Sequence, residues 1–255
     1  MFPWAAELTN QRTELRECMN LSGRPVAGSA PKPRTRTDHA YALLRGDIIA
    51  GRLKPGTKLR VEQLRADYDI GATPLREALS RLSADGFVIS EGQRGFRVVP
   101  ISYDDLQDIT RVRILIETEA LRDSIENGDD AWEARLVAAY YRLSKLEAQE
   151  EQDYEQRERA NEAFHDALLA GCTSPLLRRL HHTLYDQHKR YRNISLMNPA
   201  VPRDVHEEHR AIYDAALERD AQRACEATRV HVMRTMEVTL DVFRKAEETP
   251  TSTAD

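Results

Sequence analysis

The hydrophobic pattern of the chain changes at Pro100, and this change constrains the fold more than any other feature. Before Pro100, short segments with helical spacing of apolar residues are followed by two segments rich in the β-branched and aromatic residues of strands. After Pro100, long segments with helical spacing follow one another, and none is typical of a strand. The sequence therefore predicts two domains of different architecture that meet near residue 100.

The first domain is expected at residues 38–100. A short apolar stretch at residues 59–61 opens its second helix. Three short helices followed by a β-hairpin are the order of elements in a winged helix-turn-helix. The spacing predicts helices at about residues 38–50, 61–68 and 73–86, and strands at about residues 87–90 and 95–99.

The second domain is expected at residues 101–246, as an all-α antiparallel bundle of about six helices. Ser102 and Asp105 resemble a capping pair at the start of its first helix. The fold class is therefore mainly α. Residues 1–37 and 247–255 lack apolar periodicity and are expected to form a flexible arm and a flexible tail. The later helices are expected at about residues 131–148, 154–170, 175–191, 203–218 and 221–245.

Length and composition agree with a globular protein of this size. Of the 255 residues, 41% are hydrophobic and 31% are charged. No apolar run approaches the roughly 20 residues of a membrane span, and residues 1–20 have charged side chains where a secretory signal is apolar. The 3 cysteines lie far apart, which argues against a disulfide framework. We expect a cytoplasmic protein without a membrane partner.

Charge is distributed unevenly between the two domains. Residues 1–102 carry 16 Lys and Arg against 11 Asp and Glu, a net charge of +5. Residues 103–255 carry 21 against 31, a net charge of −10. A basic region suits a polyanion such as DNA, because phosphate contacts dominate the affinity for nucleic acids. Both regions are equally compatible with ordinary solvated surfaces, so charge alone does not decide.

The segment after Gly71 carries the strongest functional signal. Thr73 is expected to be the N-cap of the third helix, with Pro74 at the first helical position, where its missing N–H costs nothing. The apolar side of this helix consists of Leu75, Ala78, Leu79 and Leu82. The opposite side, which is free to enter a DNA major groove, carries Thr73, Arg76, Glu77 and Ser80.

This segment resembles the GntR family of bacterial transcription regulators. The resemblance extends from Tyr41 to Val99 and includes the run from Thr73 to Leu79. In this reading, Arg76 contacts a guanine and Thr73 contacts a phosphate at the helix N-terminus. The residues expected to contact DNA are Thr73, Arg76, Ser80, Arg60, Arg65, Gln93, Arg94 and Gly95.

The sequence departs from the family pattern just before the third helix. The family usually has Ser-Arg before this Thr-Pro, whereas Gly71 and Ala72 stand here. One frequent DNA contact is therefore missing, and the candidates to replace it are Arg60, Arg65 and, in the arm, Arg34 and Arg36. An arginine in such a position is more often an ordinary surface residue than a phosphate contact, and the alternative for Arg76 is a contact with Glu77 or Ser80 on its own helix.

Three histidines are expected on core-facing sides of different helices in the bundle. They are His165, His209 and His231. Neutral imidazoles that converge inside a bundle can bind Zn²⁺ or a similar ion. On spacing alone, the alternative is that they are ordinary core histidines with hydrogen-bond partners. A further group, His181, His182 and His188, has mostly polar neighbours and is expected at the surface.

The stretches around these histidines resemble the FCD ligand-binding domain of the FadR-type branch of the family. The resemblance implies a divalent metal, Zn²⁺ or else Ni²⁺ or Mn²⁺, held by Asn161, His165, His209 and His231. Many members have Asp where Asn161 stands, and a neutral oxygen ligand is expected to weaken the metal or change its preference. The resemblance also puts Arg113 and Glu117 beside the effector. Arg113 is a candidate clamp for a carboxylate, and the alternative is an internal salt bridge with Glu117.

The sequence thus predicts a homodimeric transcription regulator, a repressor, that binds a palindromic double-stranded DNA operator and responds to a small carboxylate. Short stretches resemble the carbon-starvation-induced regulator type, which implies a dicarboxylate such as glutarate. Two alternatives stay open: a metal-dependent hydrolase in the bundle, and an architectural DNA binder without a ligand. No catalytic residue is assigned, because the sequence has no phosphate-binding loop, no nucleophile elbow and no zinc-protease spacing.

Overall fold

The structure is a computed structural model that describes residues 35–92, 95–149, 153–195 and 203–248. The chain divides into two compact units between Val99 and Pro100. The last helix begins in the second unit, and its C-terminal part, from Thr239, is grouped with the first. Within the described ranges, none of the helices combines the length and the apolar character of a membrane span. Each unit is described by itself below.

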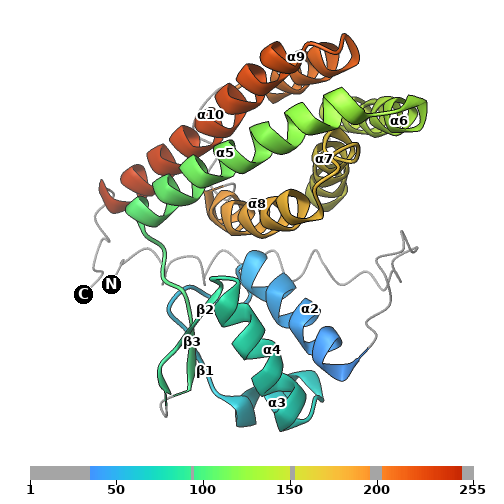
Figure 1. Ribbon diagram of the computed structural model, residues 1–255. Coiled ribbons are helices and arrows are strands. Elements are labelled where there is room, and N and C mark those ends of the chain that lie inside the picture. Colours follow the sequence, from blue (N-terminus) through green and yellow to red (C-terminus); the bar gives the residue numbers. More distant parts are fainter. Residues whose placement is uncertain (1–34, 93–94, 150–152, 196–202, 249–255) are drawn as a thin grey trace. The chain divides into compact units, whose positions relative to one another are not determined.

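The first unit contains three helices and a small sheet (Figure 1). Thr35 caps the first helix by accepting a hydrogen bond from the Asp38 amide. Strand β3 lies in the middle of the sheet, between β1 and β2, and pairs antiparallel with both. The elements are α2 (Arg36–Ile49), β1 (Lys58–Leu59), α3 (Val61–Tyr68), α4 (Ala72–Ala84), β2 (Val88–Ser90) and β3 (Phe96–Val98).

The sheet has one strand more than the sequence predicts. Residues 59–61 were expected only to open the second helix, but Lys58 and Leu59 pair with Arg97 and Phe96 as strand β1. A two-residue strand has no periodicity of its own, and its partner lies almost forty residues away. Strand β1 therefore forms only through tertiary contact with β3, and a local sequence pattern does not predict it.

Helix α4 begins earlier than expected. Gly71 is the N-cap, with extended backbone angles, and its carbonyl accepts from the Leu75 amide at 3.3 Å. Thr73 is therefore not the N-cap; it lies with Pro74 inside the first turn. The prediction of Thr73 as N-cap was wrong by two residues, because the first turn leaves its N–H groups unpaired and tolerates proline at any of these positions.

The apolar side of α4 is the centre of the first unit's core. Leu75, Ala78, Leu79 and Leu82 are all completely buried. Polar contacts fix α2 against α4: the Tyr41 hydroxyl donates to Asp85 at 2.6 Å, and Arg81 lies over the Tyr41 ring. The exposed side of α4 is thereby held on a rigid support.

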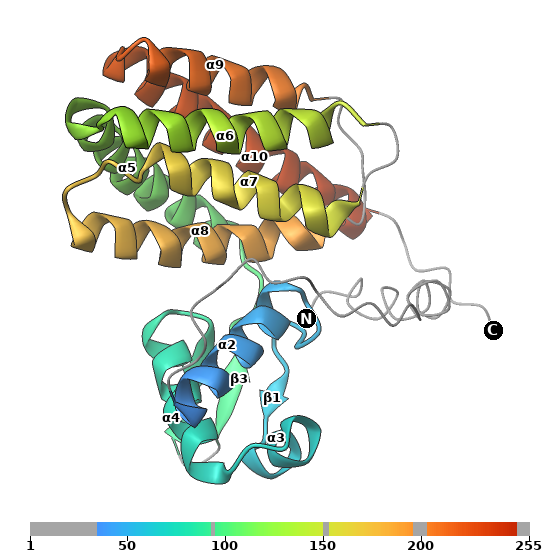
Figure 2. The same ribbon diagram turned by 90° about the vertical axis from the view of Figure 1, so that its right-hand side faces the viewer.

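The second unit is a helical bundle (Figure 2). Ser102, Asp129, Asp153 and Asp204 cap four of its helices through side-chain oxygens. Helix α5 packs on α8, and α6 packs on both α7 and α9. The helices are α5 (Tyr103–Asn127), α6 (Asp130–Glu147), α7 (Tyr154–Leu168), α8 (Pro175–Ser195), α9 (Val205–Leu217) and α10 (Ala221–Glu248).

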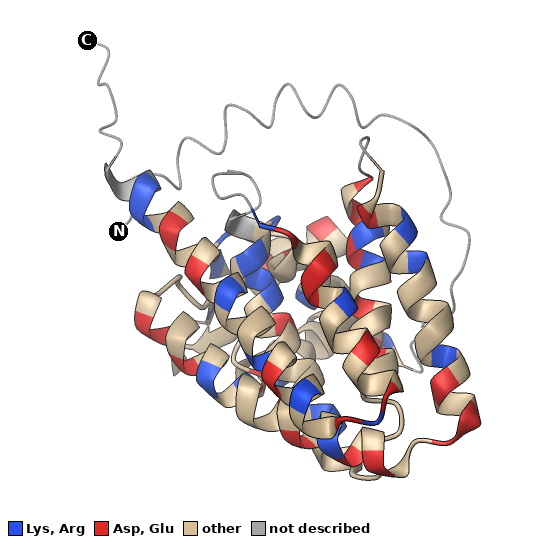
Figure 3. Cartoon of the chain, turned by 90° about the horizontal axis from the view of Figure 1, so that it is seen from above, with Lys and Arg blue, Asp and Glu red and all other residues tan. Residues whose placement is uncertain are grey.

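An apolar cluster occupies one part of the bundle interior. It includes Trp132, Leu136, Phe164 and Ile212, each fully buried. The remaining interior contains buried charged and polar side chains, which are described with the site below. Acidic and basic residues are interspersed along the bundle helices (Figure 3). The fold class expected from the sequence, a winged helix-turn-helix followed by an all-α bundle, is confirmed.

Candidate DNA-binding surface and candidate metal centre

The exposed side of α4 presents the polar residues that the sequence predicts there. Thr73, Arg76, Glu77 and Ser80 are all exposed. Glu77 accepts a hydrogen bond from the Thr37 hydroxyl of α2 at 2.7 Å. Among the described residues, Arg76 has neither an ion-pair nor a hydrogen-bond partner, so the contact with Glu77 or Ser80 is not formed. Its guanidinium is available to a ligand from outside.

The other residues expected to contact DNA differ in their exposure and in whether they already have a partner within the chain. Arg60 is exposed at the N-cap of α3. Arg65 is paired with Glu62 one turn earlier, at 2.8 Å. Gly95 has a φ of +92°, a left-handed conformation that favours glycine at the base of the wing. Gln93 and Arg94 lie outside the described residues.

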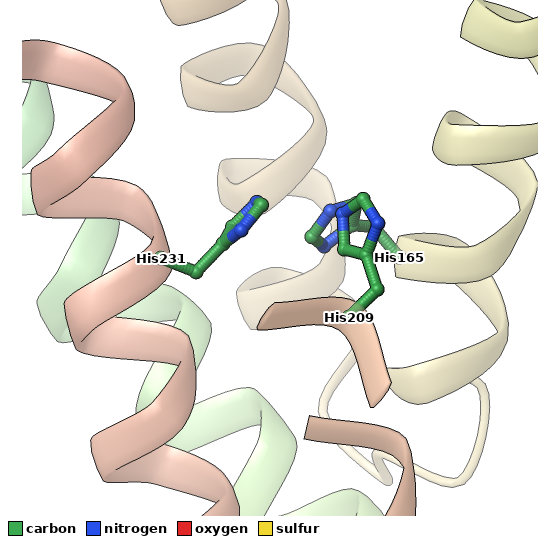
Figure 4. Close-up of side chains that lie close together, drawn as sticks. All are labelled: His165, His209 and His231. Atoms are coloured by element: carbon green, nitrogen blue, oxygen red, sulfur yellow. The ribbon is translucent and has the colours of Figure 1, made fainter. Parts of the chain in front are cut away.

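Three histidines from three helices meet inside the bundle. His165 comes from α7, His209 from α9 and His231 from α10, and Figure 4 shows their rings pointing toward one another. Each is at most 4% exposed. One nitrogen of each ring lies within 4.8 Å of one nitrogen of the other two. Nitrogens that share one tetrahedral ion at about 2.0–2.1 Å lie about 3.4 Å apart, so the three rings are near enough to be drawn onto one ion by rotation of their side chains.

Each of these imidazoles has a carboxylate beside its Nδ1 atom. Glu147 Oε1 lies 2.7 Å from Nδ1 of His209, and Glu208 Oε2 lies 2.9 Å from Nδ1 of His231. The third carboxylate, Glu117 Oε1, lies 3.3 Å from Nδ1 of His165. A carboxylate on one nitrogen of a metal-binding histidine orients the ring and directs the other nitrogen to the metal.

The Nε2 atoms of these rings are in a state that is consistent with metal binding. Nε2 of His165 and Nε2 of His209 are buried and have no hydrogen-bond partner. A buried polar atom without a partner costs free energy unless a ligand completes it. Asn161 is also buried, and its amide nitrogen donates to the Tyr185 hydroxyl at 2.8 Å. The amide oxygen is the atom of Asn161 with the chemistry of a metal ligand. The residues present therefore fit a divalent ion.

The protonation states favour a metal as well. Burial lowers the pKa of His165 to about 4 and lowers the pKa of His231 well below its ordinary value. Both rings are therefore neutral at pH 7, which is the form that binds metals. Burial alone would raise the pKa of Glu117, but the nearby Arg113 and histidines hold it well below the usual range. Glu117 is therefore ionised.

Arg113 forms a buried ion pair with Glu117. Its Nε atom donates to Glu117 Oε2 at 2.7 Å, and both side chains are at most 3% exposed. Nη1 of Arg113 lies 3.2 Å from Nδ1 of His188, and the guanidinium lies over the Tyr185 ring. The internal salt bridge considered as an alternative is therefore formed, and it belongs to the same polar interior as the three histidines.

Two histidines expected at the surface are in fact buried. His181 is 2% exposed and His188 is fully buried, whereas His182 is exposed as predicted. The expectation was based on their polar sequence neighbours. It failed because the interior that α8 faces is itself polar: His188 meets Arg113, and Nε2 of His181 lies 3.6 Å from Glu117.

The sequence did not predict two of the three carboxylates. Glu208 directly precedes His209, but its partner is His231, on the next helix. Glu147 ends α6 and is 62 residues away from His209. Only the fold brings these residues together, so a sequence pattern gives no indication of the pairing.

Comparison with known proteins identifies the family. Residues 36–98 match the family of bacterial regulatory proteins called gntR, and residues 108–234 match the FCD domain. The chain belongs to the GntR family. It is 42% identical over 223 residues to the uncharacterized HTH-type transcriptional regulator BphR of Paraburkholderia xenovorans (strain LB400), covering 84% of this chain and 91% of that protein.

A further relative and a solved structure are also similar to this chain. The HTH-type transcriptional repressor GlaR of Escherichia coli (strain K12) is 37% identical over 199 residues, covering 76% of this chain and 90% of that protein. The solved structure of E. coli McbR/YncC has a similar fold, with a TM-score of 0.71 at 22% identity, and covers 82% of this chain and 99% of that one.

This GntR-family protein with its FCD domain is a DNA-binding transcriptional regulator rather than an enzyme, because its relatives are regulators. The hydrolase alternative is thereby set aside. Members of the family bind DNA operators.

Proposed function

We propose that the protein is a cytoplasmic repressor that binds a palindromic operator as a homodimer and responds to a small carboxylate at a divalent metal in its bundle. The observation that carries this proposal is the set of three buried histidines, each beside a carboxylate from a different helix. The repressor named GlaR, 37% identical, supports the direction of regulation. The family resemblance supports the effector class.

His165, His209 and His231 would hold the metal, with the amide oxygen of Asn161 as a fourth ligand. Imidazole nitrogens favour Zn²⁺ or Ni²⁺, and the neutral amide oxygen adds no charge to the site. When bound, the ion supplies Lewis acidity toward an oxygen of the effector. Glu147, Glu208 and Glu117 keep the three rings oriented.

Arg113 and His188 are the groups that would receive the effector's carboxylate. Glu117 neutralises much of the Arg113 charge, yet Nε2 of His188 is buried without a hydrogen-bond partner. A donor on His188 and the Arg113 fork together suit an anionic oxygen. A dicarboxylate has one such group for the metal and a second for this pair.

A homodimer and a palindromic operator are proposed for a reason of affinity. One winged helix presents few side chains to base edges, and Arg76 is the one with the clearest access. A dimer doubles the number of contacts, and its symmetry requires a site with two related halves. The exposed Thr73 and Ser80 flank Arg76 on the same side of α4.

The test uses His209→Ala in the full-length chain, with an operator selected from random duplexes. The effector is first identified by thermal scans of the Zn²⁺-loaded protein against small mono- and dicarboxylates, because a ligand of the native state raises its stability. We expect the variant to contain less metal by elemental analysis and to bind the operator normally. Addition of the effector should then release the operator poorly.

His206→Gln is the matched control. His206 lies on the same helix and also contacts Glu147, at 3.2 Å, but it is outside the group of three. We expect this variant to retain metal and effector response. If His209→Ala kept its metal and released the operator like the unmodified protein, the histidines would be core residues and the proposal would be wrong.

A further inference from the structure

A second cluster of metal-binding side chains lies between α7 and α8, apart from the three inner histidines. It consists of Asp166 from α7 together with the consecutive residues His181 and His182 from α8. One potential ligand atom of each residue lies within 4.8 Å of those of the other two. The inner cluster meets the same upper limit of distance, and the two clusters share no residue.

The three side chains differ in mobility in a way that suits metal capture. His181 is 2% exposed, and its buried Nε2 has no hydrogen-bond partner and lies 3.6 Å from Glu117 Oε2. His182 and Asp166 have side chains that are 56% and 45% exposed, with Nδ1 and Oδ1 at 3.5 Å. Exposed side chains can rotate at little cost, so they can close on an ion to bonds of about 2.0–2.2 Å.

From this arrangement we propose that Asp166, His181 and His182 form a second divalent-metal site, open to solvent. Two imidazoles and one carboxylate select borderline transition ions such as Zn²⁺, Co²⁺ or Ni²⁺. Ca²⁺ and Mg²⁺ prefer sites made entirely of oxygen and are not expected to bind here. The exposed side chains of His182 and Asp166 provide an entry path for the ion.

The second site is connected to the inner cluster through one carboxylate. Glu117 Oε2 lies 3.6 Å from Nε2 of His181, while Glu117 Oε1 lies 3.3 Å from Nδ1 of His165. The buried negative charge of Glu117 therefore supports a cation on either side. Loading of one site is expected to alter the affinity of the other by way of this shared group.

The test counts Co²⁺ ions bound by the full-length chain without an affinity tag, after chelator treatment and dialysis, by elemental analysis and visible absorbance. The unmodified protein should bind about two ions per chain. His182→Gln and Asp166→Asn should each lower the count to about one, as should the inner-site variant His209→Ala. His39→Gln, which removes an exposed histidine of α2, is the control and should leave about two.

The variants separate this inference from the proposed function. His182 and Asp166 are exposed, so their replacement leaves the core intact, and circular dichroism verifies the fold. If His182→Gln and Asp166→Asn bound as many ions as the unmodified protein, the second site would be refuted whatever His209→Ala does. If the count fell in these two variants but not in His209→Ala, the second site would stand and the inner metal would be refuted.

Discussion

The candidate sites of the two units of this regulator differ in where their charged side chains lie. At the candidate DNA-binding surface of the first unit the charges are exposed: Arg76 has no partner among the described residues, and the Arg65–Glu62 pair is 50% and 74% exposed. In the bundle, the Arg113–Glu117 pair is 3% and 2% exposed. A surface that binds DNA needs cations that a phosphate or base can reach, whereas a sensor of a small anion needs polar groups that water does not satisfy.

Exposed and buried ion pairs also differ in the free energy that is lost when one partner is removed. An exposed ion pair contributes about 0–1 kcal/mol, because water and salt screen it. A buried pair has lost its hydration, so removal of one partner leaves an uncompensated charge and costs about 3–5 kcal/mol. Buried ion pairs therefore add little net stability to the bundle. Their presence beside the three histidines is what a ligand site would require.

Glu117→Ala is expected to give the largest effect. It should lower the free energy of unfolding of the bundle by about 3–5 kcal/mol, because Arg113 is left buried without its partner. Denaturant titration with Trp132 fluorescence, in a Trp4→Phe background, measures this. Glu62→Ala, in the exposed pair, should change stability by less than about 1 kcal/mol. Equal costs for the two variants would remove the contrast between the units.

Acid should destabilise the metal-free bundle at a pH above that at which the buried Glu117 is protonated. The pKa of His165 is about 4 in the folded chain and 6.5 without burial, so the unfolded state binds more protons between these values. Stability is therefore complete above pH 6.5 and falls as the pH falls toward 4. From pH 7 to pH 4.5 the loss from this residue is roughly 3 kcal/mol, at about 1.4 kcal/mol per pH unit.

The same fluorescence measurement, in the presence of a chelator, tests this pH dependence. His188 and His231 act in the same direction, since burial lowers their pKa values as well. Glu117 and Glu147 have lowered pKa values and lose their contributions only below about pH 4.5. His165→Gln should make the stability curve flatter. A bundle whose stability is constant from pH 7 to 4.5 would contradict the buried neutral imidazoles.

The sequence predicted the first unit better than the polar interior of the second. Leu75, Ala78, Leu79 and Leu82 repeat at helical spacing, and burial of a single apolar side follows directly from that periodicity. Strand β1 escaped prediction because its two residues gain their structure only from β3.

Apolar periodicity does not reveal the polar part of the bundle interior. The family resemblance named Arg113, Glu117, Asn161 and the three histidines, and the fold brings the histidines together. His181 and His188 were misassigned because polar neighbours on α8 normally indicate a surface. Their burial depends on Arg113 and Glu117, which lie on α5, so only tertiary structure reveals it.

Arg76→Ala tests the exposed side of α4 in the first unit. Its expected free-energy effect is smaller than those predicted for Glu117→Ala and for acid. A guanidinium that reads a guanine contributes about 1–3 kcal/mol of discrimination, so operator affinity should fall by that amount and the sequence preference should relax. Stability should not change, because Arg76 is exposed and has no partner among the described residues. Fluorescence anisotropy with operator and scrambled duplexes measures both affinities.

Arg65→Ala is the matched control for this prediction. Arg65 is exposed on the neighbouring helix but already engaged with Glu62 at 2.8 Å. If it touches DNA at all, it does so through a phosphate, and its loss should weaken operator and scrambled duplexes equally and reduce the salt dependence of binding. Equal losses on both duplexes for Arg76→Ala as well would mean that Arg76 positions the protein without reading a base. An unchanged operator affinity would exclude Arg76 from the interface.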